Sequence, residues 1–290
     1  MHHFTAHAFP PDLLFHDWCE ARQLWDSLLS LGPVQALVLM PDHVHLIARD
    51  LDPQAWWHAL RGYARWRNHH RGEPGRRVWL ALGPPEEVLG AKHLRRALRY
   101  LALNPCRDRL VADPLAWPFS TYRDSVGLAV PGVVAIERDP VAWHAYVSSD
   151  PSVSVEGTDL PSGLRGLRAA SVEQVVEAVS ALARTPVEDL RRRGPARTLL
   201  VQGLLGCAHL SGRAVARHLG LSHTAIQKAA PLPSGTHARI ERVLGDRRFA
   251  ALHTHDLSLE WAWRRYREGR ERRGAYAALL ERAPRSAPRP

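Results

Sequence analysis

The chain has 290 residues, of which 45% are hydrophobic, so it can bury one large core or two ordinary ones and is not a disordered chain. No run approaches the roughly 18 apolar residues that span a bilayer, and the start lacks the cationic and then apolar plan of a signal peptide. The net charge of +10 indicates a polyanionic partner, most simply nucleic acid, although arginine also accumulates through GC-rich coding bias. Three cysteines without metal-ligand spacing suggest a reduced, cytoplasmic setting: Cys19, Cys106 and Cys207.

Strands alternate with helices over the first part of the chain. The apolar patterns predict a strand near 2–8, a helix over about 17–31, and strands at about 34–40 and 43–49. A helix over roughly 53–70 follows, and then a loop rich in Gly and Pro at 72–90. This order of elements predicts an α+β fold with a short sheet that pairs with itself.

The strand at 43–49 contains two histidines that are separated by one apolar residue, His43 and His45. Residues two apart in a strand point to the same face, so both imidazoles project together. Two neighbouring imidazoles can hold one divalent metal ion when a third ligand comes from elsewhere. The alternative is a pair of solvent-facing histidines on a half-buried strand. Asp42, which comes directly before the pair, is expected to face away from it.

A segment at 94–105 offers both a third ligand and a nucleophile. Its leucines recur at helical spacing, and Pro105 predicts that the helix ends near Asn104. Tyr100 lies four residues before Asn104, so the phenol and the amide share one face of this helix. The alternative is an amphipathic helix with a buried tyrosine. Three arginines on the same turns suit an anionic substrate: Arg95, Arg96 and Arg99.

Arginines and aromatic residues interleave between positions 56 and 79. Guanidinium groups for phosphate beside rings for base stacking predict a platform for single-stranded nucleic acid, with Arg65 among the DNA contacts. The alternative is an amphipathic helix whose aromatic residues belong to the core. The residues are Arg61, Arg65, Arg67, Arg71, Arg76, Arg77, Trp56, Trp57, Tyr63, Trp66 and Trp79.

Three segments together resemble the marker segments of the single-tyrosine HUH transposases, and most closely those of the REP-associated tyrosine transposases. The segments are Met40-Pro41-Asp42-His43-Val44-His45-Leu46, Arg99-Tyr100-Leu101-Ala102-Leu103-Asn104-Pro105 and Trp117-Pro118-Phe119-Ser120-Thr121-Tyr122. Their order and approximate spacing are those of the family. The resemblance covers roughly residues 1–127 and implies a ferredoxin-like HUH domain, an antiparallel sheet with helices on one face.

The resemblance also implies a mechanism. His43, His45 and Asn104 would be metal ligands, and Tyr100 would be the nucleophile. Mg²⁺ or Mn²⁺ suits such a mixed imidazole and oxygen set, although ligand chemistry alone also admits Zn²⁺. Single-stranded or hairpin DNA would then be cleaved and rejoined through a 5′-phosphotyrosine. Coordinated cleavage of two ends with one tyrosine per chain implies a homodimer.

The second half of the chain predicts a separate helical unit. Composition shifts to Gly, Pro and Ser over 128–166, which predicts a linker, although apolar stretches inside it can still pack. We therefore expect a catalytic domain at 1–127 and a helical DNA-binding domain at 167–260. The end of the chain, 261–290, predicts a basic tail that is helical or disordered.

A helix-turn-helix pattern occupies 211–228. Ala216 is small where two helices cross, Gly220 suits the tight turn, and Ile226 packs inward. The alternative is an ordinary αα-hairpin. Residues 171–230 also resemble the C-terminal duplex-binding domain of bacterial replication initiators. In a recognition helix in the major groove, the DNA contacts would be Ser222, His223, Thr224, Gln227 and Lys228.

Two other functions stay open. The family usually carries an Arg-Gly-Asn stretch in its opening strand and a Phe-Gln-Gly-Arg-Phe stretch between the first two markers, and this chain has neither at 4–11 or 78–85. These departures favour a domesticated, non-catalytic DNA-binding regulator that retains the fold. A metal-dependent hydrolase without a covalent intermediate ranks last, because it needs a carboxylate base beside the histidines.

Overall fold

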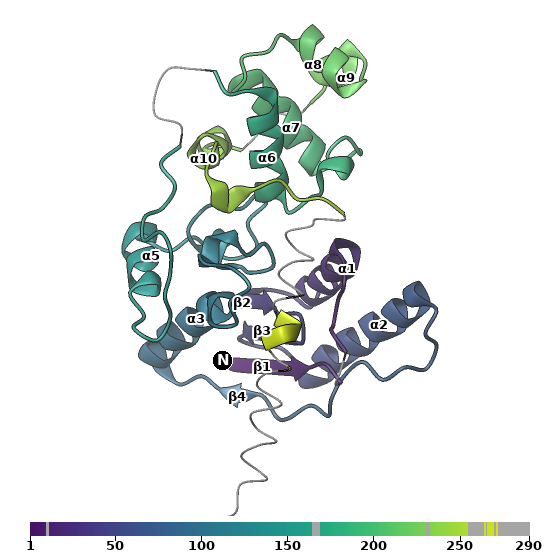
Figure 1. Ribbon diagram of the computed structural model, residues 1–290, viewed down its shortest axis with the longest axis vertical. Coiled ribbons are helices and arrows are strands. Elements are labelled where there is room, and N and C mark those ends of the chain that lie inside the picture. The colour runs from purple at the N-terminus through teal and green to yellow at the C-terminus, as the bar shows by residue number, and fades with distance from the viewer. Residues whose placement is uncertain are drawn as a thin grey trace, which may run out of the picture.

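The computed structural model describes residues 1–9, 12–163, 169–229, 233–254, 264, 266–269 and 271. The predicted tail at 261–290 lies for the most part outside the described residues, as does the predicted boundary at 166. A four-stranded antiparallel sheet in the order β2-β3-β1-β4 forms the centre of the N-terminal half (Figure 1). Its strands are β1 (His2–His7), β2 (Val34–Leu39), β3 (His43–Ala48) and β4 (Glu86–Glu87).

The register of β1 and β3 decides which side chains share a face of the sheet. Thr5 lies opposite His45, and His7 lies opposite His43. Residues that lie directly opposite each other in an antiparallel pair project to the same side. His3, Thr5 and His7 therefore stand on the face of the two histidines of β3, while Phe4 projects to the other side.

Helices cover the two faces of the sheet differently. On the Phe4 face, α2 (Pro53–Arg71) packs against α1 (Trp18–Leu29), and the ring of Trp56 lies 5.7 Å from that of Phe4. On the histidine face, α3 (Gly90–Arg107) crosses the sheet and brings the ring of Tyr100 to 5.6 Å from that of His45. The predicted α+β class, with an antiparallel sheet and a helical part after it, is confirmed. The helices lie on both faces of the sheet, however, and not on one as the resemblance implied.

The helix α3 is longer than its proline predicts. It runs through Pro105 to Arg107, and the Asp108 amide donates to the Asn104 carbonyl at 3.1 Å. The expectation that Pro105 ends the helix near Asn104 is wrong, because a proline removes only its own N–H and the next turn can resume. The extra turn places Arg107 two turns beyond Tyr100 on the same side of the helix.

The third marker segment extends the sheet at β2. The Leu39 amide donates to the Phe119 carbonyl at 2.9 Å, and the Thr121 amide donates to the Leu37 carbonyl at 2.9 Å. The indole of Trp117 donates to the Leu39 carbonyl, also at 2.9 Å. These bonds satisfy the outer edge of β2, so the segment has a structural role here.

The helical half begins inside the predicted linker. There, α5 (Pro140–Ser148) buries Trp143 and Val147. The pair α8–α9 lies at the end of the long axis away from the sheet (Figure 1). The remaining helices and 3₁₀ turns are Pro114–Ala116, α4 (Tyr122–Ser125), α6 (Val172–Ala183), Val187–Asp189, α7 (Pro195–Gly206), α8 (Gly212–Leu219), α9 (His223–Gln227), α10 (Thr236–Val243) and Arg247–Phe249.

The two halves share α3 and one buried arginine. Residues 102, 103 and 106 of α3 belong to the core of the helical half, whereas Leu101 belongs to the core of the sheet. The guanidinium of Arg123 is buried and donates to the carbonyls of Leu115, Ala181 and Arg248. The helical half therefore supplies both apolar contacts and hydrogen-bond acceptors to the half that carries the histidines.

No helix in the described part of the chain combines the length and the apolar character needed to cross a membrane. The three cysteines form no disulfide; Cys19 is exposed, and Cys106 and Cys207 are buried.

Candidate active site

The two histidines of β3 lie side by side, with ring centroids 4.9 Å apart. The carboxylate of Asp42 lies 2.7 Å from Nδ1 of His43. The hydroxyl of Thr5 lies 3.1 Å from Nδ1 of His45. A partner on Nδ1 orients an imidazole and leaves Nε2 as the ligand atom. The expectation that Asp42 faces away from the histidines is wrong, because Asp42 precedes the strand and does not follow its alternation.

His45 is held as a neutral imidazole. It is 6% exposed, and burial, followed by the neighbouring charge of His43, lowers its pKa to about 2. Its Nε2 is buried and has no hydrogen-bond partner in the described part of the chain. A buried polar atom without a partner carries a desolvation cost, which coordination to a cation would offset.

The helix α3 adds the predicted nucleophile and the third ligand. The amide of Asn104 is buried, with its nitrogen assigned 3.4 Å from Nε2 of His43; the opposite amide orientation presents the oxygen there instead. Tyr100 is 42% exposed, and its ring meets that of His45 edge-on. The structure thus brings together all four residues of the predicted site.

The donor atoms fit a divalent metal ion. Nε2 of His45 is unpartnered, Nε2 of His43 faces the Asn104 amide, and both Nδ1 atoms are already engaged. Two imidazoles and one amide oxygen, with water completing the shell, form a set that Mn²⁺ or Mg²⁺ accepts.

The strand β1 supplies site residues that were not predicted. Nε2 of His3 lies 3.0 Å from Nδ1 of His45, and the ring of His7 stacks on that of His43 at 5.3 Å. With Thr5 between them, these residues alternate along a predicted strand. That alternation was the available signal, but the face it occupies follows only from the pairing with β3.

Basic residues surround Tyr100 on α3. The guanidinium of Arg107, which was not predicted, lies 4.7 Å from the centroid of the Tyr100 ring. That of Arg99 lies 4.4 Å from the ring of Tyr146 on α5 and 3.3 Å from the carboxylate of Asp150. The two other predicted contacts on this helix are exposed: Arg95 and Arg96.

The predicted platform on α2 is largely internal. Arg67 is fully buried and donates to the carbonyls of Leu13 and Leu14. Arg71 makes two hydrogen bonds to the carboxylate of Glu20, a residue of α1. The interpretation of Arg67 and Arg71 as DNA contacts is wrong, because both guanidinium groups are already bonded to acceptors within the protein. The sequence pattern did not show this, since the acceptors come from a distant part of the chain. Three of the rings are core residues: Trp56, Tyr63 and Trp79.

Arg61 and Arg65 are the exposed arginines of that prediction on α2, and Arg65 is not brought to the site. Its helix lies on the Phe4 face of the sheet, whereas Tyr100 lies on the histidine face. A nucleic acid that contacts both residues must pass around an edge of the sheet.

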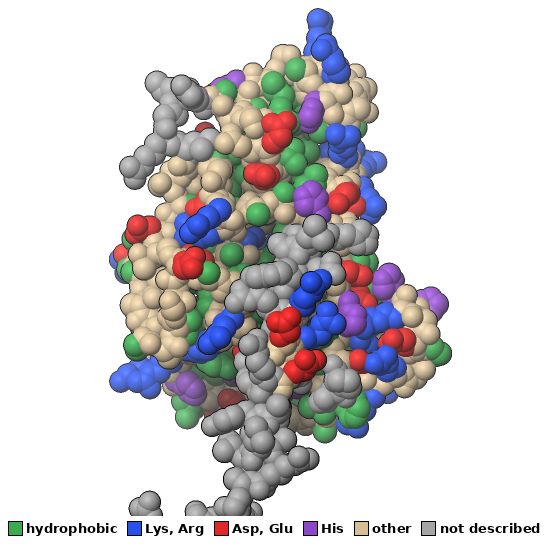
Figure 2. Space-filling model, viewed as in Figure 1, with side chains coloured by type: hydrophobic (Ala, Val, Ile, Leu, Met, Phe, Trp, Pro, Cys, Tyr) green, Lys and Arg blue, Asp and Glu red, His purple; other side chains and the backbone are tan. Residues whose placement is uncertain are grey.

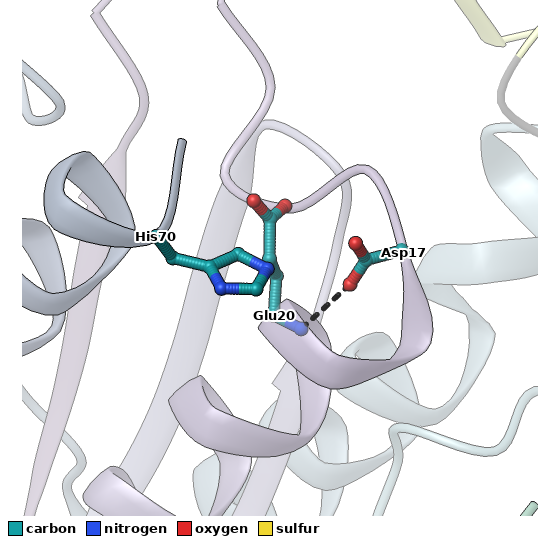
Figure 3. Close-up of side chains that lie close together, drawn as sticks. All are labelled: Asp17, Glu20 and His70. Atoms are coloured by element: carbon teal, nitrogen blue, oxygen red, sulfur yellow. Dashed lines mark hydrogen bonds between the residues drawn. The ribbon is translucent and has the colours of Figure 1, made fainter. Parts of the chain in front are cut away.

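A second group of possible metal ligands lies at the start of α1 (Figure 3). Asp17 caps the helix by accepting from the Glu20 amide at 2.8 Å, the dashed line in Figure 3. Both carboxylate oxygens of Glu20 accept from Arg71, and one also accepts from the His16 amide. The ring of His70 stacks on Trp66. Because a guanidinium already neutralises Glu20, this group is an ion pair and a helix cap.

The predicted recognition residues are exposed at the far end of the molecule. Ile226 and Ala216 are buried between α8 and α9, and Gly220 adopts a left-handed φ of +68° at the turn. The hydroxyl of Ser222 accepts from the Ala225 amide and so caps α9. The helix α9 has 5 residues, and its DNA-binding role stays a prediction. The exposed side chains are those of Ser222, His223, Thr224, Gln227 and Lys228.

The positive charge of the chain is not gathered in one patch on the face shown in Figure 2. There, Lys and Arg side chains are interspersed with Asp and Glu. Individual uncompensated guanidinium groups are therefore more informative than the net charge of +10.

Comparisons with known proteins add little to this geometry. No protein-family model matches the chain, and no curated protein matches it significantly. A solved structure of a REP-associated tyrosine transposase bound to a REP hairpin is similar, with 20% sequence identity and a TM-score of 0.36, over 48% of this chain and 84% of that one. A likeness this distant decides nothing about the site, so its function has to be argued from its own residues.

Proposed function

We propose that this chain cleaves and rejoins single-stranded or hairpin DNA through a covalent bond to Tyr100. The observation that carries the proposal is an exposed tyrosine beside a buried imidazole whose Nε2 has no partner. The large majority of buried side-chain polar atoms have a hydrogen-bond partner, and this unpartnered nitrogen lies beside an exposed phenol. The same pair of residues belongs to two marker segments of the transposase resemblance.

Each residue has a defined part in the proposed reaction. The Tyr100 oxygen attacks a phosphodiester phosphorus, a P–O bond to tyrosine forms, and the bond to the 3′ oxygen breaks to leave a 3′-hydroxyl. The Arg107 guanidinium, over the tyrosine ring, binds the DNA backbone beside the reacting phosphate. His43, His45 and Asn104 would hold Mg²⁺ or Mn²⁺, which supplies Lewis-acid polarisation of a phosphate oxygen. Attack by a second 3′-hydroxyl on the phosphotyrosine reverses the step and joins a new strand.

The helical half has a separate proposed part. Its exposed α9 side chains suit the major groove of duplex DNA, so this half would select the site while the sheet half performs the chemistry. Coordinated cleavage of two ends favours a homodimer, since each chain contributes one nucleophile.

A covalent adduct tests the proposal directly. The protein is incubated with end-labelled hairpin oligonucleotides and Mn²⁺ and then denatured; labelled protein is expected from the parent chain and none from Tyr100→Phe. Tyr146→Phe is the matched control, because it removes one hydroxyl from the ring that packs on Arg99. Tyr122 is a poor substitute nucleophile, since burial raises the pKa of its phenol and it hydrogen-bonds His144. An equal yield from Tyr100→Phe would contradict the assignment.

The same experiment addresses the regulator alternative. A domesticated regulator forms no adduct under any condition and still binds a specific duplex. The departures at 4–11 and 78–85 favour this outcome, and the exposed Tyr100 beside unpartnered His45 favours catalysis.

A further inference from the structure

Two arginines of α3 form a cationic pair beside the proposed nucleophile. Arg99 and Arg107 are eight residues apart, about two helical turns, and lie on the same side of the helix. Their side chains are only 17% and 27% exposed, and the Arg107 guanidinium lies over the ring of Tyr100. A pair of partly buried guanidinium groups suits a tetrahedral anion with several oxygens.

One carboxylate lies between the two arginines. Oδ2 of Asp150 lies 3.3 Å from Nε of Arg99 and 3.4 Å from Nη2 of Arg107. Asp150 follows directly after Ser149, the C-cap of α5, in the predicted linker. Its other oxygen accepts from the amide and hydroxyl of Ser152. The Ser152 hydrogen bonds and the two arginines lower the pKa of Asp150, which therefore carries its charge at neutral pH.

The carboxylate leaves the arginines incompletely satisfied. Nε and Nη2 of Arg99 and Nη1 of Arg107 are buried and have no hydrogen-bond partner in the described part of the chain. The pair formed by Arg71 and Glu20 differs, because there two nitrogens meet two carboxylate oxygens. A single carboxylate compensates one of the two positive charges of Arg99 and Arg107 and leaves most of their donors unused.

We propose that Arg99 and Arg107 form a phosphate-binding site for the nucleic-acid backbone, and that Asp150 occupies this site as a built-in competitor when no nucleic acid is bound. The proposal rests on the proposed function, since it assigns the phosphate next to the one that Tyr100 attacks. A phosphodiester offers two non-bridging oxygens and so satisfies nitrogens that one carboxylate oxygen cannot reach. Exchange of one monoanion for another leaves the net charge around the two arginines unchanged.

The competitor lowers the apparent affinity for DNA, because only the fraction of molecules whose site is open can bind. If Asp150 fills the site in about 90% of molecules, its removal tightens binding about tenfold. Its removal also raises the net positive charge around the two arginines by one. The affinity of the variant for single-stranded DNA should therefore fall more steeply with salt than that of the parent.

The test is the affinity of Asp150→Asn for a fluorescein-labelled oligothymidylate, measured by anisotropy in EDTA so that cleavage does not contribute. Asparagine keeps an oxygen for Ser152 and removes the charge. The control is Asp26→Asn, which removes a carboxylate from an ion pair with Arg22 on α1. We expect about tenfold tighter binding and the steeper salt slope for Asp150→Asn, and neither change for the control.

A second comparison isolates the arginine. In an Arg107→Ala background, Asp150→Asn is expected to gain less than half of its effect, because one partner of the carboxylate is gone. Equal affinity of the parent and Asp150→Asn overturns this inference and leaves the proposed function standing. Absence of binding by both chains overturns the two together.

Discussion

Two arginine-rich helices, α2 and α3, lie on opposite faces of one sheet and differ in where their guanidinium groups find acceptors. On α2, Arg67 donates to backbone carbonyls and Arg71 pairs with Glu20 through two hydrogen bonds. On α3, Arg99 and Arg107 share one carboxylate oxygen and keep buried nitrogens without partners. The two helices have similar compositions. Arg67 and Arg71 of α2 bond to other segments of the protein, whereas Arg99 and Arg107 of α3 keep hydrogen-bond donors that the protein does not use.

An arginine that stabilises the fold therefore differs from one that is available to a ligand in the acceptors that surround its guanidinium. A guanidinium has five donors, so counting those that are met by the protein shows how many are left for a ligand.

Removing the acceptor on the α2 side should destabilise the fold. Glu20→Ala leaves Arg71 largely buried without its carboxylate, which costs about 3–5 kcal/mol of unfolding free energy. Urea denaturation measures this loss, and Glu20→Gln, which keeps one oxygen, should lose less. Single-strand binding by the folded fraction should not change. A loss below about 1 kcal/mol would place Arg71 with the surface ion pairs instead.

The same carboxylate predicts a pH dependence. Burial raises the pKa of Glu20, but hydrogen bonds from Arg71 and the His16 amide outweigh burial and leave the pKa lowered. A lowered folded-state pKa means that the stabilisation is fully present above the unfolded value and is lost as pH falls through the folded value. The parent should therefore lose stability in acid more steeply than Glu20→Gln, as followed by denaturation midpoints from pH 6 downwards.

Most elements of the sheet half could be predicted because each follows a local pattern, but β4 lies inside the segment predicted as a loop at 72–90. The alternation in β3 placed His43 and His45 on one strand, and the leucines of α3 placed Tyr100 and Asn104 on one helix. Long-range pairing could not be predicted. The contact of Thr5 with His45 depends on the register of β1, and the length of α3 depends on packing that tolerates Pro105. The internal role of Arg67 likewise depends on carbonyls 53 and 54 residues away.

On the α3 side, the orienting partner of His43 should matter for metal affinity. Asp42→Ala removes the carboxylate from Nδ1 and should weaken Mn²⁺ binding by about 10- to 100-fold, as outer-shell partners do. Calorimetric titration measures this, and His45→Ala should abolish binding. Asp50→Ala, an exposed aspartate beyond the other end of β3, is the control. Unchanged Mn²⁺ affinity in His45→Ala would show that the histidine pair is structural.

The exposed face of α9, which lies far from α2 and α3, carries hydrogen-bonding side chains that are not arginines. Thr224→Ala and Gln227→Ala should each weaken specific duplex binding by about 1–3 kcal/mol if the side chain hydrogen-bonds a base edge. Covalent adduct formation on a bare hairpin should be unaffected. Arg217→Ala, on the exposed side of α8, separates base recognition from general attraction to phosphate, since it should weaken all duplexes alike. Duplex binding that ignores the α9 changes would indicate an αα-hairpin with a packing or assembly role.

The smallest effect, and the most direct comparison of the two faces, comes from Arg65→Ala against Arg107→Ala. Each removes one guanidinium, but Arg107 lies over Tyr100 and Arg65 lies on the helix behind the sheet. With an oligonucleotide too short to pass around the sheet edge, Arg107→Ala should reduce the salt slope by about 0.7 and Arg65→Ala should leave it unchanged. With a longer hairpin, Arg65→Ala should reduce the slope as well if the DNA wraps around that edge. Equal effects of both variants on the short strand would mean that phosphates bind the two faces without regard to the tyrosine, and the distinction between α2 and α3 would then fail.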